Sequence, residues 1–350
     1  MALNTITINN IDESDHIPDD IISEADVVTL QKAQINFNEL TNSRIRFFQK
    51  KIFILNCIGL KFYCYDFKGN LQYSIDLSKK KDPGGKNYKI SDFLIKSWKE
   101  IRFIVSDRST LLFFEKNELK DTLKFNFWAK ELEQLKNGEY LFYQDFVNDR
   151  YGKPSHVIKT NSSFEIKETY LPTSDMEANM ANKNSTVMYN MFKSGENINI
   201  LQEQFYNIFR YPDFSKAYYY IDFLKYKFSP LDAGSHSLNN KRKALLNSFW
   251  EISNTINFSY FFETKPNFVF YNKETKSLLK TKDLNSVNRM ILSNIKAVNE
   301  DFFISVVSSD VIKEISKISD KTKMGVLRNL DLHKMPSANP ILISFKLRRF

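Results

Sequence analysis

The chain has 350 residues, and 42% of them are apolar. A chain of this size and composition can bury a substantial core, which excludes an intrinsically disordered protein and a miniprotein held together by disulfides. Its 50 basic and 41 acidic side chains give a formal charge of +9. The densest basic runs, at 79–81 and 241–243, are short and far apart, so we expect solvated charge rather than a nucleic-acid-binding surface. No apolar run approaches the roughly 18 residues that a membrane helix needs.

Short strand-like segments recur along the chain in units of about 40 residues, a period typical of repeat folds. The chain contains 31 Phe and 17 Tyr, and aromatic residues favour strands. In the first unit, strand-like runs at 51–56, 61–66 and 71–76 are separated by turns. The same rhythm returns in later units, which lie at 101–125, 139–170 and 258–280.

Units of this length with four short strands predict β-propeller blades, which bury their faces by stacking on one another. A β-sandwich would use only about 100 residues of the chain. An α/β sheet would need regular amphipathic helices, and the pattern predicts helices only near 238–247 and 309–319. We therefore predict an all-β fold, a six-bladed β-propeller with four-stranded antiparallel blades, as a single domain over residues 1–350. The predicted blades are 44–78, 88–127, 128–172, 185–224, 248–283 and 288–350.

The two ends of the chain are expected to close the ring, because an open propeller would expose two sheet edges. The run 340–347 is strand-like, and so are 5–8 and 27–30. We predict that one of these N-terminal strands completes the last blade beside the C-terminal strand. The helix predicted at 309–319 begins at acceptable capping residues and should form an insertion between strands of that blade.

Several stretches carry, in this order, a resemblance to a known family. They are Val27–Leu30, Lys51–Ile54 with Tyr65–Asn70, the loop Asp82–Phe93, Tyr218–Phe223 with Lys227 and Phe228, and Asn339–Lys346. Together they resemble the six-bladed β-propeller proteins of Bacteroidetes, a family of mostly uncharacterised exported proteins that are often lipid-anchored. The loop departs from the Gly-Pro-Gly-Glu-Tyr-like pattern of the family, because Asp82–Tyr88 lacks the glutamate before the tyrosine. No role of that carboxylate can therefore be transferred.

The resemblance implies an extracytoplasmic location, in the periplasm or at the cell surface. The family usually begins with a signal peptide and a lipid-accepting Cys, and neither is present here. Two explanations stay open, namely a cytoplasmic member or a lipoprotein whose leader is replaced by Met1 and Ala2, and we favour the second. Any membrane contact would then depend on a lipid anchor that is absent from this chain.

No catalytic or metal-binding motif occurs in the sequence. None of the histidines forms an HExxH or H-x-H pattern, and Walker, Rossmann, G-x-S-x-G and EF-hand spacings are absent. Cys57 and Cys64 are seven residues apart across a predicted turn, where a disulfide is an alternative, but we favour two half-buried thiols. We expect no catalytic residue, no cofactor and no metal. The histidines are His16, His156, His236 and His333.

Carboxylates recur near predicted strand ends, where Asp side chains commonly accept backbone N–H bonds in turns. We interpret them as turn residues rather than catalytic groups. Aromatic clusters such as Tyr218–Tyr220 are expected in the core, because both faces of a blade lie against its neighbours. The carboxylates concerned are Asp66, Glu115, Asp222 and Glu263.

Ligand-binding residues are expected where the innermost strands meet around the central channel. If each blade runs from inside to outside, these strands lie near 44–48, 91–95, 126–130, 187–192, 250–254 and 290–295. Their polar members are our candidate ligand-binding residues, namely Arg46, Asp92, Asn126, Asn190, Glu251 and Asn294.

The sequence thus predicts a binding or scaffold module outside the cytoplasm, with an unidentified ligand that is a glycan, a peptide or a protein. The alternative is a propeller enzyme, such as a lactonase, a lyase or a glycan hydrolase, with its site at the channel mouth. That enzyme would need carboxylates or histidines from several blades around one metal or sugar. A third alternative, nucleic-acid binding, would need the cations on one face, and we expect no nucleic-acid partner.

Overall fold

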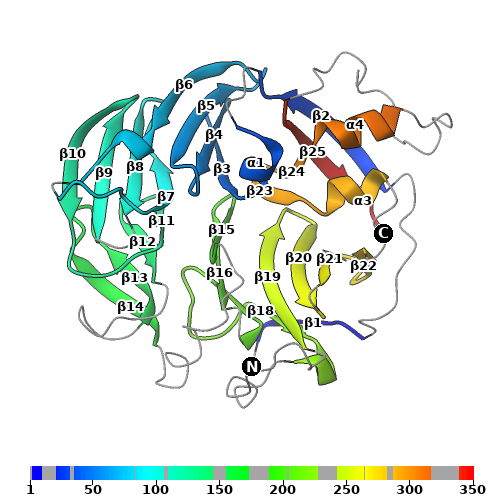
Figure 1. The fold of residues 1–350 in the computed structure, drawn as a ribbon. Helices are drawn as coiled ribbons and strands as arrows, with labels where there is room; N and C mark the ends of the chain where they lie inside the picture. Colours follow the sequence, from blue (N-terminus) through cyan, green and yellow to red (C-terminus); the bar gives the residue numbers. More distant parts are fainter. Residues whose placement is uncertain are drawn as a thin grey trace.

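The computed structural model describes residues 2–9, 21–31, 35–82, 84–105, 109–144, 155–172, 189–202, 205–227, 243–263, 265–281, 287–316 and 339–350. In this part of the chain, six antiparallel sheets stand around a central axis as the blades of a propeller, which confirms the predicted fold class (Figure 1). Strand order follows the sequence from the axis outward in blades one, two, three and five and over the four inner strands of blade four.

In blades one to three, each strand pairs with its neighbours in the sequence, and these twelve strands lie between residues 43 and 172. Blade one contains β3 (Ser43–Phe48), β4 (Lys51–Asn56), β5 (Lys61–Asp66) and β6 (Leu71–Asp76); blade two contains β7 (Ile90–Ile95), β8 (Glu100–Val105), β9 (Thr110–Glu115) and β10 (Glu118–Lys124); blade three contains β11 (Glu131–Gln134), β12 (Tyr140–Tyr143), β13 (Ser155–Thr160) and β14 (Ile166–Pro172).

Blades four to six include the two N-terminal strands, which join sheets built mainly from the second half of the chain. Blade four contains β15 (Met191–Ser194), β16 (Asn197–Gln202), β17 (Asn207–Arg210), β18 (Tyr219–Asp222) and β1 (Asn4–Thr7); blade five contains β19 (Ala244–Glu251), β20 (Thr255–Phe262), β21 (Lys265–Asn272) and β22 (Leu278–Thr281); blade six contains β23 (Ile295–Asn299), β24 (Phe302–Val307), β25 (Ile341–Leu347) and β2 (Ile22–Thr29).

The N-terminal strand β2 closes the ring as predicted. It is the outer strand of blade six and pairs antiparallel with β25, for example through Val28 and Leu342. Gly69, in the β5–β6 turn of blade one, has a φ of +80°, and a Cβ there would meet the Thr29 carbonyl oxygen at 1.9 Å. Because the backbone of Gln31 also donates to the Gly69 carbonyl at 2.8 Å, the closing strand is fixed to the first blade as well as to the last.

The strand β1 has a different role, which the sequence did not predict. It pairs parallel with β18, with Ile6 opposite Ile221, and so adds a fifth strand to blade four. The N-terminal segment therefore contributes to two blades that lie on opposite sides of blade five (Figure 1).

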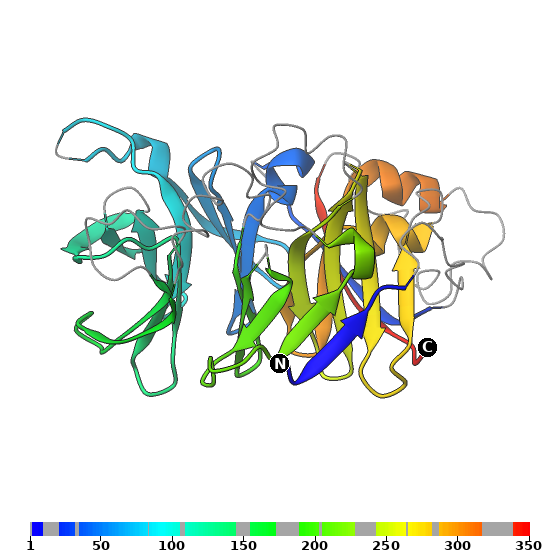
Figure 2. The same cartoon turned by 90° about the horizontal axis from the view of Figure 1, so that it is seen from below.

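Three helices, α1 (Phe37–Thr41), α3 (Val287–Leu292) and α4 (Ser309–Ser316), lie on one face of the ring (Figure 2). The helix α4 lies between β24 and β25 in the sequence, as predicted for an insertion. The helix predicted at 238–247 is wrong over its described part, because residues 244–247 belong to β19. Short 3-10 helices occur at Leu77–Lys79 and Leu224–Tyr226. None of the described helices is long and apolar enough to cross a membrane.

The core lies between the blades, where large aromatic side chains of neighbouring sheets interlock. Phe62 of blade one, which is fully buried, packs edge-on against Phe93 and Phe103 of blade two, with ring centroids 5.2 and 5.1 Å apart. Cys57 and Cys64 are free thiols, the first half-buried and the second fully buried. Each blade thus stabilises the next by burying apolar surface, as expected for a propeller.

Candidate functional site

The inner strands β3, β7, β11, β15, β19 and β23 face the central channel (Figure 1). A cavity of about 230 Å³ lies between them, and residues from all six blades line it. The lining residues come mostly from the later halves of these strands and from the turns that follow. The helices α1 and α3 precede inner strands on the helical face of the ring (Figures 1 and 2). Because the lining residues come mostly from the later halves of the inner strands, the cavity lies toward the opposite face.

One wall of the cavity is built on a group of buried charged side chains, which we call the channel cluster. Its members come from the inner strands of blades one, two and three, and all of their side chains are at least 85% buried. The channel cluster consists of Arg44, Arg46, Asp92, Glu131 and Glu133.

Strand geometry explains why these side chains converge. Residues two apart on a strand point to the same face, so Arg44 with Arg46 and Glu131 with Glu133 form two pairs that face each other. The entry into β3 is fixed by α1, where Asn36 and Glu39 form a reciprocal capping box with two bonds of 2.9 Å.

Asp92 connects the two arginines to blade three. Its Oδ2 accepts from Arg46 Nη2 at 2.9 Å and from the Leu132 backbone N–H at 3.1 Å, and its Oδ1 lies 3.5 Å from Arg44 Nε. Arg46 also donates to Glu133 through Nη1. Two of the predicted site residues, Arg46 and Asp92, are therefore in direct contact, and Arg46 lines the cavity.

Glu131 is fully buried and fastens blade four to blade three. Its two carboxylate oxygens accept the backbone N–H groups of Asn190 and Met191 at 2.5 and 2.9 Å. The predicted site residue Asn190 uses its own side chain to donate to the Leu201 carbonyl at 3.1 Å. Asn190 thus lies beside the channel cluster, and its Oδ1 also accepts from Lys130 Nζ at 3.4 Å, so its bonds connect blades three and four.

The electrostatic environments of the two glutamates differ. Burial raises the pKa of Glu131, although Arg44 and Lys130 oppose this. Burial also favours the neutral form of Glu133, but the charges of Arg46 and Lys193 overcome it and hold the pKa of Glu133 below its ordinary value. For Arg46, burial acts to lower the pKa, and the Asp92 and Glu133 carboxylates raise it above the usual value. Glu133 and Arg46 therefore form a charged pair at the cavity wall.

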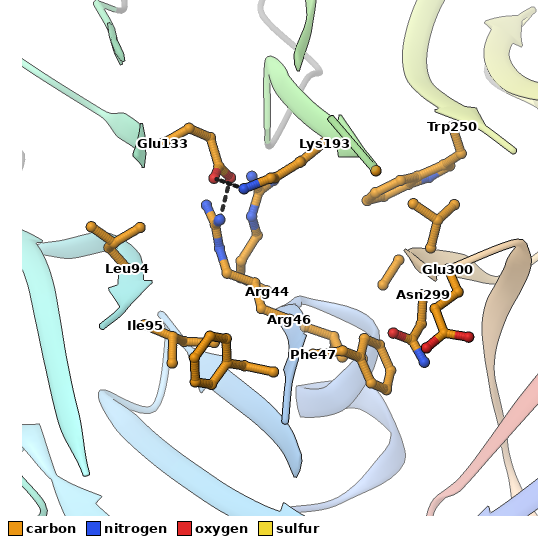
Figure 3. Close-up of a pocket in the computed structure, with 15 residues that line it drawn as sticks. Arg44, Arg46, Phe47, Leu94, Ile95, Glu133, Lys193, Trp250, Asn299 and Glu300 are labelled. Carbon is orange, nitrogen blue, oxygen red and sulfur yellow. Dashed lines mark hydrogen bonds and ion pairs between the residues drawn. The ribbon is translucent and has the colours of Figure 1, made fainter. Parts of the chain in front are cut away.

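The rest of the cavity combines an apolar wall with a polar rim (Figure 3). Lys193, whose side chain is 45% exposed, stands beside Glu133 with its Nζ 3.7 Å from Oε2. Asn299 and Glu300 lie across the cavity from this pair (Figure 3). The apolar lining includes Phe47, Leu94, Ile95, Trp250 and Val298.

The predicted residue Glu251 is buried in a second polar group, which we call the Glu251 cluster. Its Oε2 accepts from Asn199 Nδ2 at 3.1 Å and from Arg210 Nη2. Its Oε1 accepts from Tyr219 Oη at 3.0 Å and from Lys273 Nζ at 3.2 Å. The cluster joins blades four and five. Glu251 does not line the cavity, although its neighbour Trp250 does.

The two remaining predicted residues do not belong to inner strands. Asn126 is exposed in the segment between β10 and β11, because the inner strand of blade three begins only at Glu131. Asn294 lies between α3 and β23, where its backbone carbonyl accepts from the Val306 N–H at 3.1 Å. Neither residue lines the cavity.

Sequence reasoning missed Lys193 and four further residues of this region, and three of those four carried a signal. Glu131 and Glu133 alternate with Leu132, and Arg44 stands two residues before Arg46, so a period-two charge pattern marks both inner strands. Trp250 carried no such signal, because its position depends on how blade five packs.

The described residues contain no group of three His, Cys, Asp or Glu side chains arranged to hold a metal ion. Of the histidines, His156 is buried in blade three with its ring stacked on Tyr143, at a centroid distance of 6.0 Å. His16, His236 and His333 lie outside the described residues.

The fold is shared with solved structures from Bacteroides. A Bacteroides fragilis protein thought to be exported has a TM-score of 0.76 and 15% identity, with 99% of this chain and 100% of that chain covered. A member of the DUF4221 family from Bacteroides vulgatus has a TM-score of 0.53 and 9% identity, with 94% and 98% covered. No protein-family model matches the chain, and a search of curated proteins finds no match. The resemblance to exported Bacteroides propellers is therefore confirmed at the level of the fold.

Proposed function

We propose that this propeller is an extracytoplasmic binding module that takes a small ligand, or one end of a larger one, into the cavity of its central channel. The observation that carries the proposal is the cavity of about 230 Å³ that residues of all six blades line beside buried charges. A concave site with an apolar wall and a few convergent polar groups is the usual form of a ligand pocket. At about 30 Å³ for each water, this cavity has room for roughly eight waters, and so for a small organic molecule.

The location rests on the comparison with known structures. One similar propeller is thought to be exported, and it is covered over its whole length by this chain. The resemblance to a family whose members are often lipid-anchored is the basis for proposing that the native protein carries a lipid anchor. Fractionation of the native organism, with detection in the membrane and soluble envelope fractions, tests both parts of this proposal; a purely cytoplasmic protein would contradict them.

Binding is favoured over catalysis by the state of the carboxylates. Asp92 and Glu131 each accept bonds from an arginine or from backbone N–H groups, and neither lines the cavity. Glu133 does line it, but this carboxylate is paired with Arg46. A pair of free carboxylates facing one ligand, which a glycan hydrolase requires, is not formed by the channel cluster.

The test fills the cavity without breaking its charged wall. Asn299→Trp places a large ring at the rim from a half-buried position, and Asn117→Trp is the matched control on the exposed β9–β10 turn of blade two. A panel of monosaccharides, short peptides and small organic acids is screened by ligand-observed NMR. We expect a hit that binds the native protein and Asn117→Trp but not Asn299→Trp. A ligand that binds all three equally would place the site elsewhere.

A further inference from the structure

The cavity region contains hydrogen-bond donors that have no acceptor among the described residues. Arg44 Nη1, Arg46 Nε and Trp250 Nε1 are buried and form no hydrogen bond within this part of the chain. Arg44 and Trp250 are only 4% and 8% exposed, and both line the cavity, as Arg46 does. Guanidinium and indole groups can donate but not accept, so only an incoming acceptor can satisfy them. A buried donor without a partner raises the free energy of the protein, so an acceptor that bonds to it binds more tightly.

The carboxylates of the protein cannot supply that acceptor, because their bonds are directed elsewhere. Glu133 is engaged by Arg46 and Lys193, and Glu131 by two backbone N–H groups. The charges around the cavity are balanced, so the unpaired donors rather than a net charge call for an acceptor. The cations are Arg44, Arg46, Lys130 and Lys193, and the carboxylates are Asp92, Glu131, Glu133 and Glu300.

The opposite side of the cavity limits the charge and sets the polarity of the ligand. Glu300 stands exposed on the rim across from Lys193 (Figure 3), so a dianion would meet an unfavourable charge there. Between the two sides, Phe47, Leu94 and Trp250 offer apolar surface to an uncharged body.

We infer that this cavity, taken as the binding site proposed above, accepts a small monocarboxylate with an apolar body. The carboxylate lies toward Arg44, Arg46 and the Trp250 indole N–H, and the body lies against the apolar wall. A carboxylate matches the planar fork of a guanidinium and accepts charge-assisted hydrogen bonds from its free N–H groups. The inference rests on the proposed function, because it names the chemistry of the ligand at the same site.

The experiment compares an acid with its uncharged amide, using phenylacetate and phenylacetamide as the probes in isothermal titration calorimetry. The two differ in charge but hardly in size. We expect phenylacetate to bind, and phenylacetamide to bind at least about tenfold more weakly, because charge-assisted hydrogen bonds are roughly twice as strong as neutral ones.

Two conservative variants locate the contact. Trp250→Phe removes the indole donor but keeps an aromatic ring, and should weaken phenylacetate binding by about five- to tenfold. Trp98→Phe, at a half-buried tryptophan of blade two that does not line the cavity, should leave it unchanged. Lys193→Met removes the half-exposed ammonium and should weaken binding by about threefold. These variants spare the buried arginines, so loss of folding does not confuse the result.

The outcomes separate the two proposals. Equal affinity for the acid and the amide, equal effects of Trp250→Phe and Trp98→Phe, or no binding of phenylacetate at millimolar concentration would overturn the monocarboxylate inference. The cavity would remain the binding site in these cases if a hit of another class were lost in Asn299→Trp. Tight phenylacetate binding that survives Asn299→Trp would instead overturn the proposed site itself.

Discussion

The channel cluster and the Glu251 cluster are both built from buried ions at blade junctions, but they differ in how completely their polar atoms are paired. Both oxygens of Glu251 accept two bonds each, from donors of blades four and five. In the channel cluster, Arg44 Nη1 and Arg46 Nε are buried but have no hydrogen-bond partner in the described ranges of the chain. The Glu251 carboxylate is therefore fully paired, whereas the channel cluster still has N–H donors that can bond to a ligand.

This difference separates a structural ion group from a binding wall. A buried charge whose donors and acceptors are all satisfied has nothing left to offer a ligand, and its removal acts only on stability. A wall with spare donors tolerates its incomplete pairing only because water or a ligand can reach it. Changes in the Glu251 cluster should therefore affect folding, whereas changes at the cavity should affect binding.

The largest effect is expected from Glu251→Ala. This change leaves Arg210 and Lys273 facing each other without their common carboxylate, and it should lower the free energy of unfolding by about 3–5 kcal/mol. Urea denaturation measures the loss, and Glu251→Gln should lose less because it keeps the shape and some of the bonds. A loss below about 1 kcal/mol in the alanine variant would contradict a structural role for this cluster.

A smaller loss is expected from Asp92→Asn in the channel cluster. Asparagine keeps an acceptor for the Leu132 N–H but weakens the bonds from Arg46, so the loss should be about 1.5–3 kcal/mol in the same denaturation experiment. Phenylacetate should stabilise this variant at least as much as it stabilises the native protein, because the arginines of the variant have more N–H donors free to bond to the ligand. An unchanged stability would show that Asp92 does not hold the arginines in place.

The pH dependence of the free energy of unfolding tests whether Glu133 is held in its charged form. Arg46 and Lys193 hold the pKa of Glu133 below the ordinary value of 4.5 against the effect of burial, so the unfolded chain binds this proton more readily than the folded one. The stability from this group is present above about pH 4.5 and is lost as the pH falls through the folded pKa. Glu133→Gln should therefore show a shallower loss of stability on acidification, measured by denaturation between pH 6 and pH 3, at roughly unit intervals. Identical slopes for the two proteins would contradict the assignment.

The smallest effect on stability is expected from Lys193→Met. The lysine side chain is 45% exposed and its pair with Glu133 is long, at 3.7 Å, so its removal should cost less than about 1 kcal/mol of unfolding free energy. Thermal denaturation should show nearly the native midpoint for this variant while phenylacetate binding is weakened. A large loss of stability would make Lys193 part of the structural ion group instead.

The architecture could be predicted from the sequence because each blade repeats a local pattern of strands and turns. The ring closure by 27–30 beside 340–347 followed from the need to pair sheet edges. The parallel pairing of β1 with β18 could not be foreseen, because nothing local in Asn4–Thr7 specifies a distant partner strand.

Sequence reasoning placed side chains at the channel where it placed the start of the inner strand correctly. Arg46 and Asp92 lie on inner strands whose limits match the predicted ones within two residues, and they are in contact. In blade three the predicted strand began at Asn126, five residues before Glu131, so the channel glutamates were overlooked. Register errors of this size change which side chains face the axis, because strand faces alternate at every residue.

The most direct test of the central claim is crystallographic location of 4-bromophenylacetate by the anomalous signal of its bromine. We expect one bromine site within the channel cavity, against the apolar wall of Phe47 and Leu94, with the carboxylate toward Arg44 and Trp250. A bromine at the Glu251 cluster, a site only on the outer surface of a blade, or no ordered bromine in crystals soaked at saturating concentration would contradict it.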